Sequence, residues 1–170
     1  MDLRAYIRDV PDFPKPGVMF KDIMPLLASP DAFAFAVEQL AAHYPTTGVD
    51  AVAAAEARGF VFAAPLALAL KKPLVLLRKP GKLPCATHSF KYDLEYGSAE
   101  LHVHTDAITA GARVLIVDDV LATGGTMAAA CQLVARAGGT VVGCAFLIEL
   151  AFLNGRAPLA GYDIFSLLTY

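Results

Sequence analysis

Five short runs rich in Val, Ile, Leu and Phe constrain the fold of this sequence most strongly. Three of them are nearly unbroken apolar runs and do not alternate between apolar and polar residues. Strands with this pattern are buried on both faces, as in parallel sheets whose crossover helices cover each side. We therefore expect strands at residues 49–55, 74–77, 113–117, 140–148 and 163–168.

Segments with helical spacing lie between these runs. Residues 31–43 follow Ser29-Pro30, a cap with a proline in the first turn, and residues 125–137 end at Gly138-Gly139. Strands that alternate with helices predict an α/β fold with an open, mainly parallel twisted sheet flanked by helices. We expect residues 1–170 to form one domain, with its ligands beyond the carboxyl ends of the strands.

The composition argues against several classes of protein. A net charge of −2 gives no basic field that would attract nucleic acid. The longest uncharged apolar stretch, residues 59–70, contains Pro65 and is shorter than the ~20 residues that a membrane span needs. The three cysteines lack C-x-x-C spacing, which argues against a structural zinc site. The sequence begins without a signal pattern, so we expect a cytoplasmic protein. The 56% hydrophobic content leaves apolar surface for a partner subunit.

Two stretches depart from the alternation of strands and helices. Residues 11–25, which we call the hood, contain four prolines among aromatic and basic residues and predict an irregular cover over a site. Residues 78–97, which we call the lid, form a long polar stretch with glycines. Structureless loops of that length in a small domain are usually flexible functional lids or linkers, so we expect a long flexible loop here.

Residues 114–126 carry the clearest functional signal, an apolar run that ends in two acids and a turn of small residues entering a helix. Backbone N–H groups of such a turn converge on an anion, and the helix N-terminus adds partial positive charge. The carboxylates would repel a phosphate but accept hydrogen bonds from the hydroxyl groups of a sugar. This pattern predicts a ribose 5-phosphate site at Asp118, Asp119, Ala122, Thr123, Gly124, Gly125 and Thr126. The alternative is a plain tight turn after a solvated strand end.

The string 114–126 resembles the motif that binds phosphoribosyl pyrophosphate (PRPP) in the phosphoribosyltransferase family. Four further segments look like the adenine-specific branch, in matching order over nearly the full chain: FPKPGVMFKDI (13–23), EARGF (56–60), RKPGKLP (78–84) and YDLEYG (92–97). The resemblance implies the fold of that family, a homodimer, and purine salvage in which adenine and PRPP give AMP and pyrophosphate. It also implies Mg²⁺, held mainly by PRPP oxygens and waters and not by a standing metal site of the protein.

The resemblance also implies roles for individual residues. Glu95 is expected to be the general acid/base that handles the purine proton when the lid closes. The other implied roles are pyrophosphate binding by Arg58, Arg78, Lys79 and Lys82, and adenine binding by Met19, Phe20, Lys21 and Leu150. Their plain alternatives are solvated cations and, for Phe20, core packing. Nothing assigns a function to Cys85, His88, His102 or His104.

Two rival functions remain at the level of sequence. The PRPP motif alone does not choose a base, so hypoxanthine, guanine, xanthine or orotate could replace adenine; only the hood and lid favour adenine. The second rival is a regulator that keeps the fold but has lost catalysis. Such a protein would usually add a DNA-binding domain or a basic RNA-binding face and would not need Glu95, and this sequence shows Glu95 but neither addition.

Overall fold

A five-stranded parallel sheet forms the centre of the protein, in a computed structural model that describes residues 1–44, 48–94 and 97–170. Its strand order is β4-β3-β7-β8-β9. The strands are β3 (Ala51–Ala55), β4 (Leu74–Leu77), β7 (Arg113–Leu121), β8 (Thr140–Glu149) and β9 (Ile164–Thr169). All five predicted strands are therefore confirmed. The prediction ended β7 too early, because Asp118 and Asp119 interrupt the apolar run while the strand continues to Leu121.

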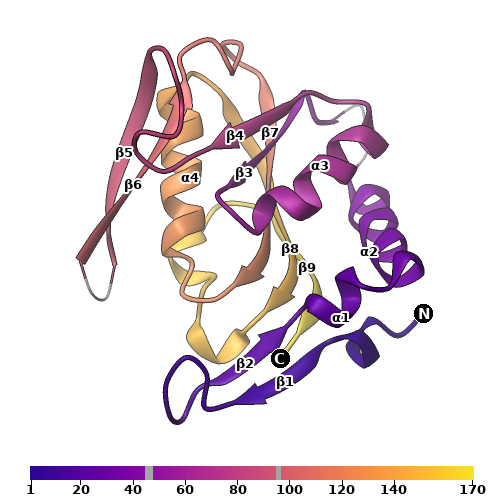
Figure 1. Cartoon of the computed structure of the whole chain (residues 1–170). Coiled ribbons are helices and arrows are strands. Elements are labelled where there is room, and N and C mark those ends of the chain that lie inside the picture. The colour runs from indigo at the N-terminus through magenta and orange to yellow at the C-terminus, as the bar shows by residue number, and fades with distance from the viewer. Residues whose placement is uncertain (45–47, 95–96) are drawn as a thin grey trace.

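Helices cover both faces of the sheet (Figure 1). Alternate residues of the central strands point to opposite sides, since successive side chains of a strand do so. Val52 and Leu115 pack with α2 (Pro30–His43) and α3 (Gly59–Leu70), whereas Ala53 and Ile116 pack with α4 (Gly125–Arg136). The predicted α/β fold is confirmed, with two cores separated by the sheet. No helix in the described parts of the chain is long and apolar enough to span a bilayer.

The helix signals in the sequence act as predicted. The Ser29 side chain accepts a hydrogen bond from the Ala32 N–H, and Pro30 occupies the first turn of α2. These contacts satisfy one of the free N–H groups at the helix start and leave the proline where no N–H is needed. α3 follows β3 after a short turn and returns the chain to β4, on one side of β3.

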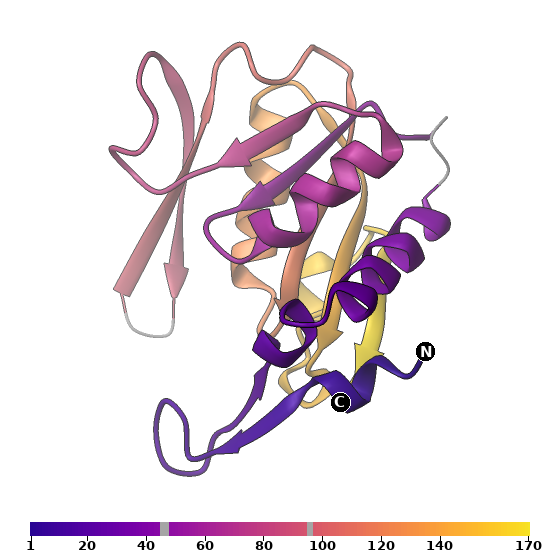
Figure 2. The same ribbon diagram turned by 45° about the vertical axis from the view of Figure 1, so that its right-hand side comes forward.

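The hood is more regular than the sequence indicates. Strands β1 (Arg8–Pro11) and β2 (Met19–Asp22) pair as an antiparallel hairpin, with Val10 opposite Phe20, so the expectation of a wholly irregular segment is wrong. Only its connecting residues 12–18 are irregular. The short helices η1 (Leu3–Tyr6) and α1 (Met24–Leu27) flank the hairpin, which lies below the carboxyl ends of the central strands in Figures 1 and 2.

The lid is not a continuous loop either. Strand β5 (Thr87–Leu94) pairs along its length with β6 (Gly97–His104), and this hairpin lies outside α4 on the same side of the sheet (Figure 2). Phe90 on β5 packs against the same core as the buried Leu101 opposite it. The flexible-loop prediction is therefore wrong for residues 87–94. Its polar residues belong to a strand that buries one face and exposes the other.

The two ends of the parallel strands differ in what they carry. At the amino end, the Arg113 guanidinium donates two 2.9 Å hydrogen bonds to the Asp50 carboxylate. At the carboxyl end lie the segment after β3, the turn between β7 and α4, and the connection from β8 to β9 with its 3-10 helices η3 (Ala151–Leu153) and η4 (Ala157–Leu159). β3 and β7 are adjacent strands from which the chain proceeds to opposite sides, and ligands of open α/β sheets bind at such a switch point.

Candidate active site

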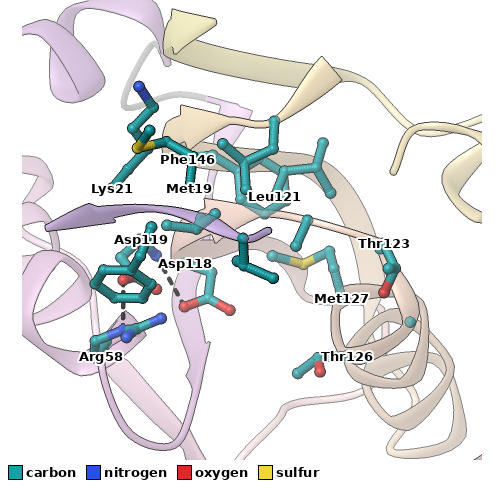
Figure 3. A pocket seen from close by; sticks show the side chains of 17 residues that line it. Met19, Lys21, Arg58, Asp118, Asp119, Leu121, Thr123, Thr126, Met127 and Phe146 are labelled. Carbon is teal, nitrogen blue, oxygen red and sulfur yellow. Dashed lines mark hydrogen bonds and ion pairs between the residues drawn. The ribbon is translucent and has the colours of Figure 1, made fainter. Parts of the chain in front are cut away.

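A cavity of about 320 Å³, the first cavity, opens at this switch point. It brings together most of the residues that the sequence predicted, from β2, β7, the following turn and the end of β8 (Figure 3). Those residues are Met19, Phe20, Lys21, Arg58, Asp118, Asp119, Ala122, Thr123, Gly124, Gly125, Thr126 and Leu150. The segments are distant in sequence, and the parallel sheet places them at one edge.

Residues 122–126, the phosphate loop, connect β7 to α4. Gly124 caps the helix with a φ of 82°, a left-handed conformation that strains any residue with a Cβ. A Cβ at this position would also collide with the carbonyl oxygen of Gly155. The small residues therefore let the loop pack against the β8–β9 connection. The first N–H groups of α4, which have no partner within a helix, are left at the cavity wall.

The two aspartates of β7 have different environments. Asp119 is 4% exposed and binds the Arg58 Nε at 2.6 Å, so its negative charge is paired. Asp118 accepts the backbone N–H of Asp119 at 2.9 Å. Burial and the neighbouring Asp119 charge raise the pKa of Asp118 from 3.8 to about 8. The site thus holds one aspartate in an ion pair with Arg58 and a second aspartate whose ionisation is disfavoured.

The turn after β3 comes unusually close to β7. A Cβ on Gly59 would lie 2.9 Å from the carbonyl oxygen of Val117 and 3.1 Å from the Asp118 Oδ1. Only a glycine fits this contact without displacing backbone. The close approach brings Arg58 within reach of Asp119, a pairing for which the sequence offered no signal beyond the neighbouring strand ends.

The hood forms the opposite wall of the first cavity. Phe20 packs edge-on against Phe13, with ring centroids 5.1 Å apart, and the Arg58 guanidinium lies 5.9 Å from the Phe20 ring centroid. The Lys21 Nζ binds the Asp9 carboxylate at 2.6 Å. Phe20 is only partly buried and faces the cavity, which does not fit the alternative of plain core packing.

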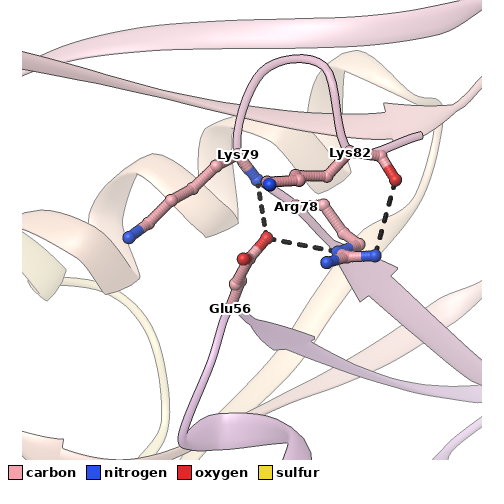
Figure 4. A network of polar contacts seen from close by, with 4 residues as sticks. All are labelled: Glu56, Arg78, Lys79 and Lys82. Carbon is pink, nitrogen blue, oxygen red and sulfur yellow. Dashed lines mark hydrogen bonds and ion pairs between the residues drawn. The ribbon is translucent and has the colours of Figure 1, made fainter.

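The basic residues of the lid lie apart from Arg58. Arg78 Nε donates to the Glu56 Oε2 at 3.2 Å, the Lys79 backbone N–H donates to the same oxygen at 3.1 Å, and an Arg78 Nη donates to the Lys82 carbonyl (Figure 4). These bonds and the nearby cations lower the pKa of Glu56, with the Lys79 N–H bond as the largest cause. Lys79 lines a second cavity, of about 610 Å³. Arg78 and Lys82 line neither of the two cavities as far as the described residues show.

Two sets of residues at the site carry no clear signal in the sequence. Val120, Leu121, Met127 and Phe146 form an apolar part of the first cavity wall. Their hydrophobicity fits a buried strand equally well, so no local signal marks them. In the sequence, Glu56 stands out only as the first residue of the EARGF segment. It comes directly after Ala55, which pairs with Leu77, and this register places Glu56 opposite Arg78. Glu95, the predicted general acid/base, lies outside the described residues.

Comparison with known proteins decides the family. The family model for the phosphoribosyl transferase domain matches residues 26–162. The chain belongs to the phosphoribosyltransferase family. It is 54% identical to the adenine phosphoribosyltransferase of Kosmotoga olearia over 170 residues, which is 100% of both chains. The fold of this phosphoribosyltransferase also matches the crystal structure of adenine phosphoribosyltransferase from Thermoanaerobacter pseudethanolicus, with a TM-score of 0.95, 51% identity and coverage of 99% and 98% of the two chains.

A more distant solved relative carries ligands. The adenine phosphoribosyltransferase of Trypanosoma brucei was solved in complex with AMP, pyrophosphate and ribose-5-phosphate. This phosphoribosyltransferase matches it with a TM-score of 0.88 and 26% identity, over 98% of its own length and 78% of the other chain. The resemblance inferred from motifs therefore extends to the whole fold.

Proposed function

We propose that this protein transfers the 5-phosphoribosyl group from PRPP to adenine, giving AMP and pyrophosphate in purine salvage. One observation carries the proposal: the phosphate loop, the Asp118–Asp119 pair and the hood face a single cavity at the switch point of the sheet. The first two suit a ribose phosphate, and the third suits a flat, uncharged base. Two relatives that are 54% identical over the whole of this chain are named adenine phosphoribosyltransferases, which supports adenine as the base.

The phosphate loop would bind the 5-phosphate of PRPP. Its backbone N–H groups, the start of α4 and the hydroxyls of Thr123 and Thr126 offer donors to the phosphate oxygens. The ribose hydroxyls would then lie near Asp118 and Asp119, whose oxygens accept their hydrogen bonds. Because Arg58 already holds Asp119, the sugar meets a carboxylate with a fixed position.

Adenine would bind between the hood and Leu150. The Phe20 ring offers a stacking face, and backbone atoms of Met19 and Lys21 offer hydrogen bonds to the ring edge. The reaction breaks the bond between the ribose C1 and the pyrophosphate oxygen, which leaves with the electron pair, and forms a bond from C1 to the adenine nitrogen. Fixed positions for both partners lower the barrier by orientation, and positive charge near the departing oxygens stabilises them.

Cations and one acid complete the proposed chemistry. Arg58, Arg78, Lys79 and Lys82 are proposed to hold the pyrophosphate, and Glu95 to exchange the proton of the purine ring as general acid/base. In the described residues no cluster of three or more His, Cys, Asp or Glu could hold a metal, and Asp119 is committed to Arg58. These residues fit a Mg²⁺ that PRPP oxygens carry, which would offset the charge of the leaving group.

We also propose a homodimer in the cytoplasm. Val61 and Leu68 of α3 and Leu74 and Leu76 of the edge strand β4 are exposed, and large apolar side chains exposed on a helix and an edge strand favour association with a second subunit. The three cysteines are free thiols, which is the state that a reducing cytosol maintains.

A single assay tests the reaction. The purified protein is mixed with Mg²⁺, PRPP and one base at a time, and pyrophosphate release is measured. We expect release with adenine and much slower release with hypoxanthine, guanine, xanthine or orotate. Equal rates with hypoxanthine or guanine would reject adenine as the preferred base, and no release with any base would favour a regulator that has lost catalysis.

A further inference from the structure

The β8–β9 connection packs directly against the phosphate loop. Gly155 is buried, and a Cβ on it would collide with the carbonyl oxygen of Ala122. On the other side of this contact, a Cβ on Gly124 would collide with the Gly155 carbonyl oxygen and would lie 2.7 Å from the Pro158 ring. Backbone thus packs against backbone here, and the position of residues 122–124 depends on where the connection holds Gly155.

An ion pair holds the middle of this connection. The Arg156 Nε donates to the Glu149 Oε1 at 2.7 Å, and an Arg156 Nη donates to the Glu149 Oε2 at 2.6 Å. Two parallel bonds of this kind fix the orientation of both side chains as well as their distance. The Glu149 side chain is only 7% exposed, and the bonds from Arg156 are the largest cause that lowers its pKa. The carboxylate is therefore ionised and paired at neutral pH.

The pair joins the connection to the strand that leads into the phosphate loop. Glu149 is the last residue of β8 and pairs in register with Leu121, the last residue of β7, so the central sheet fixes its position. Arg156 follows Gly155 directly and precedes η4, whose buried Leu159 belongs to the core around α4. The guanidinium thus links the sheet to the residue that abuts the phosphate loop.

The start of the connection is held in a different way. The Leu150 N–H donates to the Leu121 carbonyl at 2.9 Å, so β7 fixes Leu150 without help from the ion pair. Further along, the Asn154 N–H donates to the Ala151 carbonyl, which lies within the connection itself and does not tie it to the sheet. Loss of the Arg156 bonds should therefore release the middle of the connection and leave Leu150 in place.

We propose that Arg156 is a positioning residue for the 5-phosphate of PRPP, a role that rests on the proposed function for the identity of the ligand. Through Glu149 it holds Gly155 against the phosphate loop and so sets the direction of the loop N–H groups. The described lining of the first cavity includes neither Gly155 nor Arg156, so Arg156 acts through the backbone contact and not on the substrate itself. Because Leu150 is held separately, the adenine side of the site should not depend on Arg156.

The kinetics of AMP formation test this role with Arg156→Ala and Arg156→Lys, at a temperature at which circular dichroism shows each variant to be folded. We expect Arg156→Ala to raise the KM for PRPP about tenfold, because misaligned N–H groups lose part of their bonding to the phosphate, while the KM for adenine stays within about twofold. Arg156→Lys, which keeps the charge, should restore most of the affinity.

Arg113→Ala is the matched control. It removes an arginine that also makes two hydrogen bonds to one carboxylate, that of Asp50, but at the amino end of the sheet. Both of its KM values should match those of the wild type. An unchanged KM for PRPP in folded Arg156→Ala, or equal rises in the two KM values, would overturn the positioning role.

A second variant covers the case in which Arg156→Ala does not fold. Arg156→Ala leaves Glu149 as a buried carboxylate without its partner, which costs several kcal/mol in comparable cases, on the order of 3–5. The double variant Glu149→Gln/Arg156→Ala removes the same link without leaving a buried charge. It should show the same selective rise in the KM for PRPP, and a wild-type KM for PRPP would contradict the role.

Calorimetry separates the failure of this inference from the failure of the proposed function. Ribose 5-phosphate carries the phosphate but needs no catalysis, and it should bind about tenfold more weakly to Arg156→Ala or to the double variant than to the wild type and Arg113→Ala. If the wild type makes no AMP but shows this difference, the proposed function fails and the positioning role stands. Equal binding by variant and wild type, or no binding by the wild type, would reject the role of Arg156.

Discussion

Two adjacent aspartates show how strongly position changes the chemistry of identical residues. Asp119 forms an ion pair with Arg58, whereas Asp118 is partly buried beside the Asp119 carboxylate and its pKa is raised. From sequence both were assigned one role, as acceptors for sugar hydroxyls. Only the three-dimensional contacts distinguish the ion-paired Asp119 from Asp118, whose pKa is raised.

The raised pKa of Asp118 makes stability depend on pH. Between about pH 4 and 8 the folded protein keeps this proton and the unfolded chain loses it, so the contribution of Asp118 to the free energy of unfolding falls as pH rises. We expect Asp118→Asn to gain stability relative to the wild type across this window, by at most about 1.4 kcal/mol per pH unit. Urea unfolding of the ligand-free protein at several pH values measures the difference.

Glu149→Gln is the control for that experiment, with the opposite sign. Glu149 is buried, and its two hydrogen bonds from Arg156, at 2.7 and 2.6 Å, lower its pKa. Its contribution is present above the ordinary pKa of a glutamate and is lost as pH falls through the lowered value. A pH-independent difference between wild type and Asp118→Asn would show that Asp118 is ionised in the folded protein.

Glu95 is the residue on which the proposed acid/base chemistry depends. Removal of a general acid/base costs about 10²- to 10⁴-fold in rate. We therefore expect Glu95→Ala to lower kcat for AMP formation by at least about 100-fold while the KM for PRPP changes little. Asp106→Ala, which removes an exposed acid beyond β6, is the control and should keep full activity. Equal turnover in Glu95→Ala and wild type would remove Glu95 from this role.

At the scale of elements, the start of α4 depends on one glycine and tolerates change at the next. Gly124 has a positive φ and lies against the Gly155 carbonyl, whereas a Cβ on Gly125 would meet nothing within 4 Å. We expect Gly124→Ala to lower the free energy of unfolding by about 3 kcal/mol or more. Gly125→Ala should leave stability unchanged or raise it by up to about 1 kcal/mol, because alanine favours a helix. Similar urea midpoints for the two variants would contradict this view of the loop.

The elements also show where sequence reasoning succeeds and where it stops. Strands of the central sheet are buried on both faces, so their apolar runs are visible in the sequence and all five were predicted. The β5–β6 hairpin was missed because it buries one face only, and Phe90 and Tyr92 are spread among Lys91, Ser89 and other polar residues. Most of the first cavity was predicted, since its residues follow strands or form a motif. The Arg58–Asp119 and Glu56–Arg78 pairs depend on register between strands, which single-sequence patterns do not specify.

At the scale of the whole molecule, α3 and β4 present the surface that we propose for the dimer. Leu68 is 80% exposed and shares a face of α3 with Val61, seven residues earlier. We expect the wild-type protein to sediment as a dimer and Leu68→Glu to shift it toward the monomer, since a buried charge without a partner opposes association. Phe152→Glu, which alters an exposed aromatic residue on the β8–β9 connection, should leave the mass unchanged. A wild-type monomer at micromolar concentration would reject the dimer.

The division of the sheet into two ends has a practical consequence for protein engineering. The residues of the first cavity come from the carboxyl end of the strands, the start of α4 and the hood, while the amino end holds structural contacts such as the Asp50–Arg113 pair. Stabilising substitutions often reduce activity when they rigidify a site. In this protein, residues that affect only stability lie at the amino end of the sheet, away from the residues that bind substrates. Stabilising substitutions are therefore best placed at the amino end, where added rigidity does not affect the binding site.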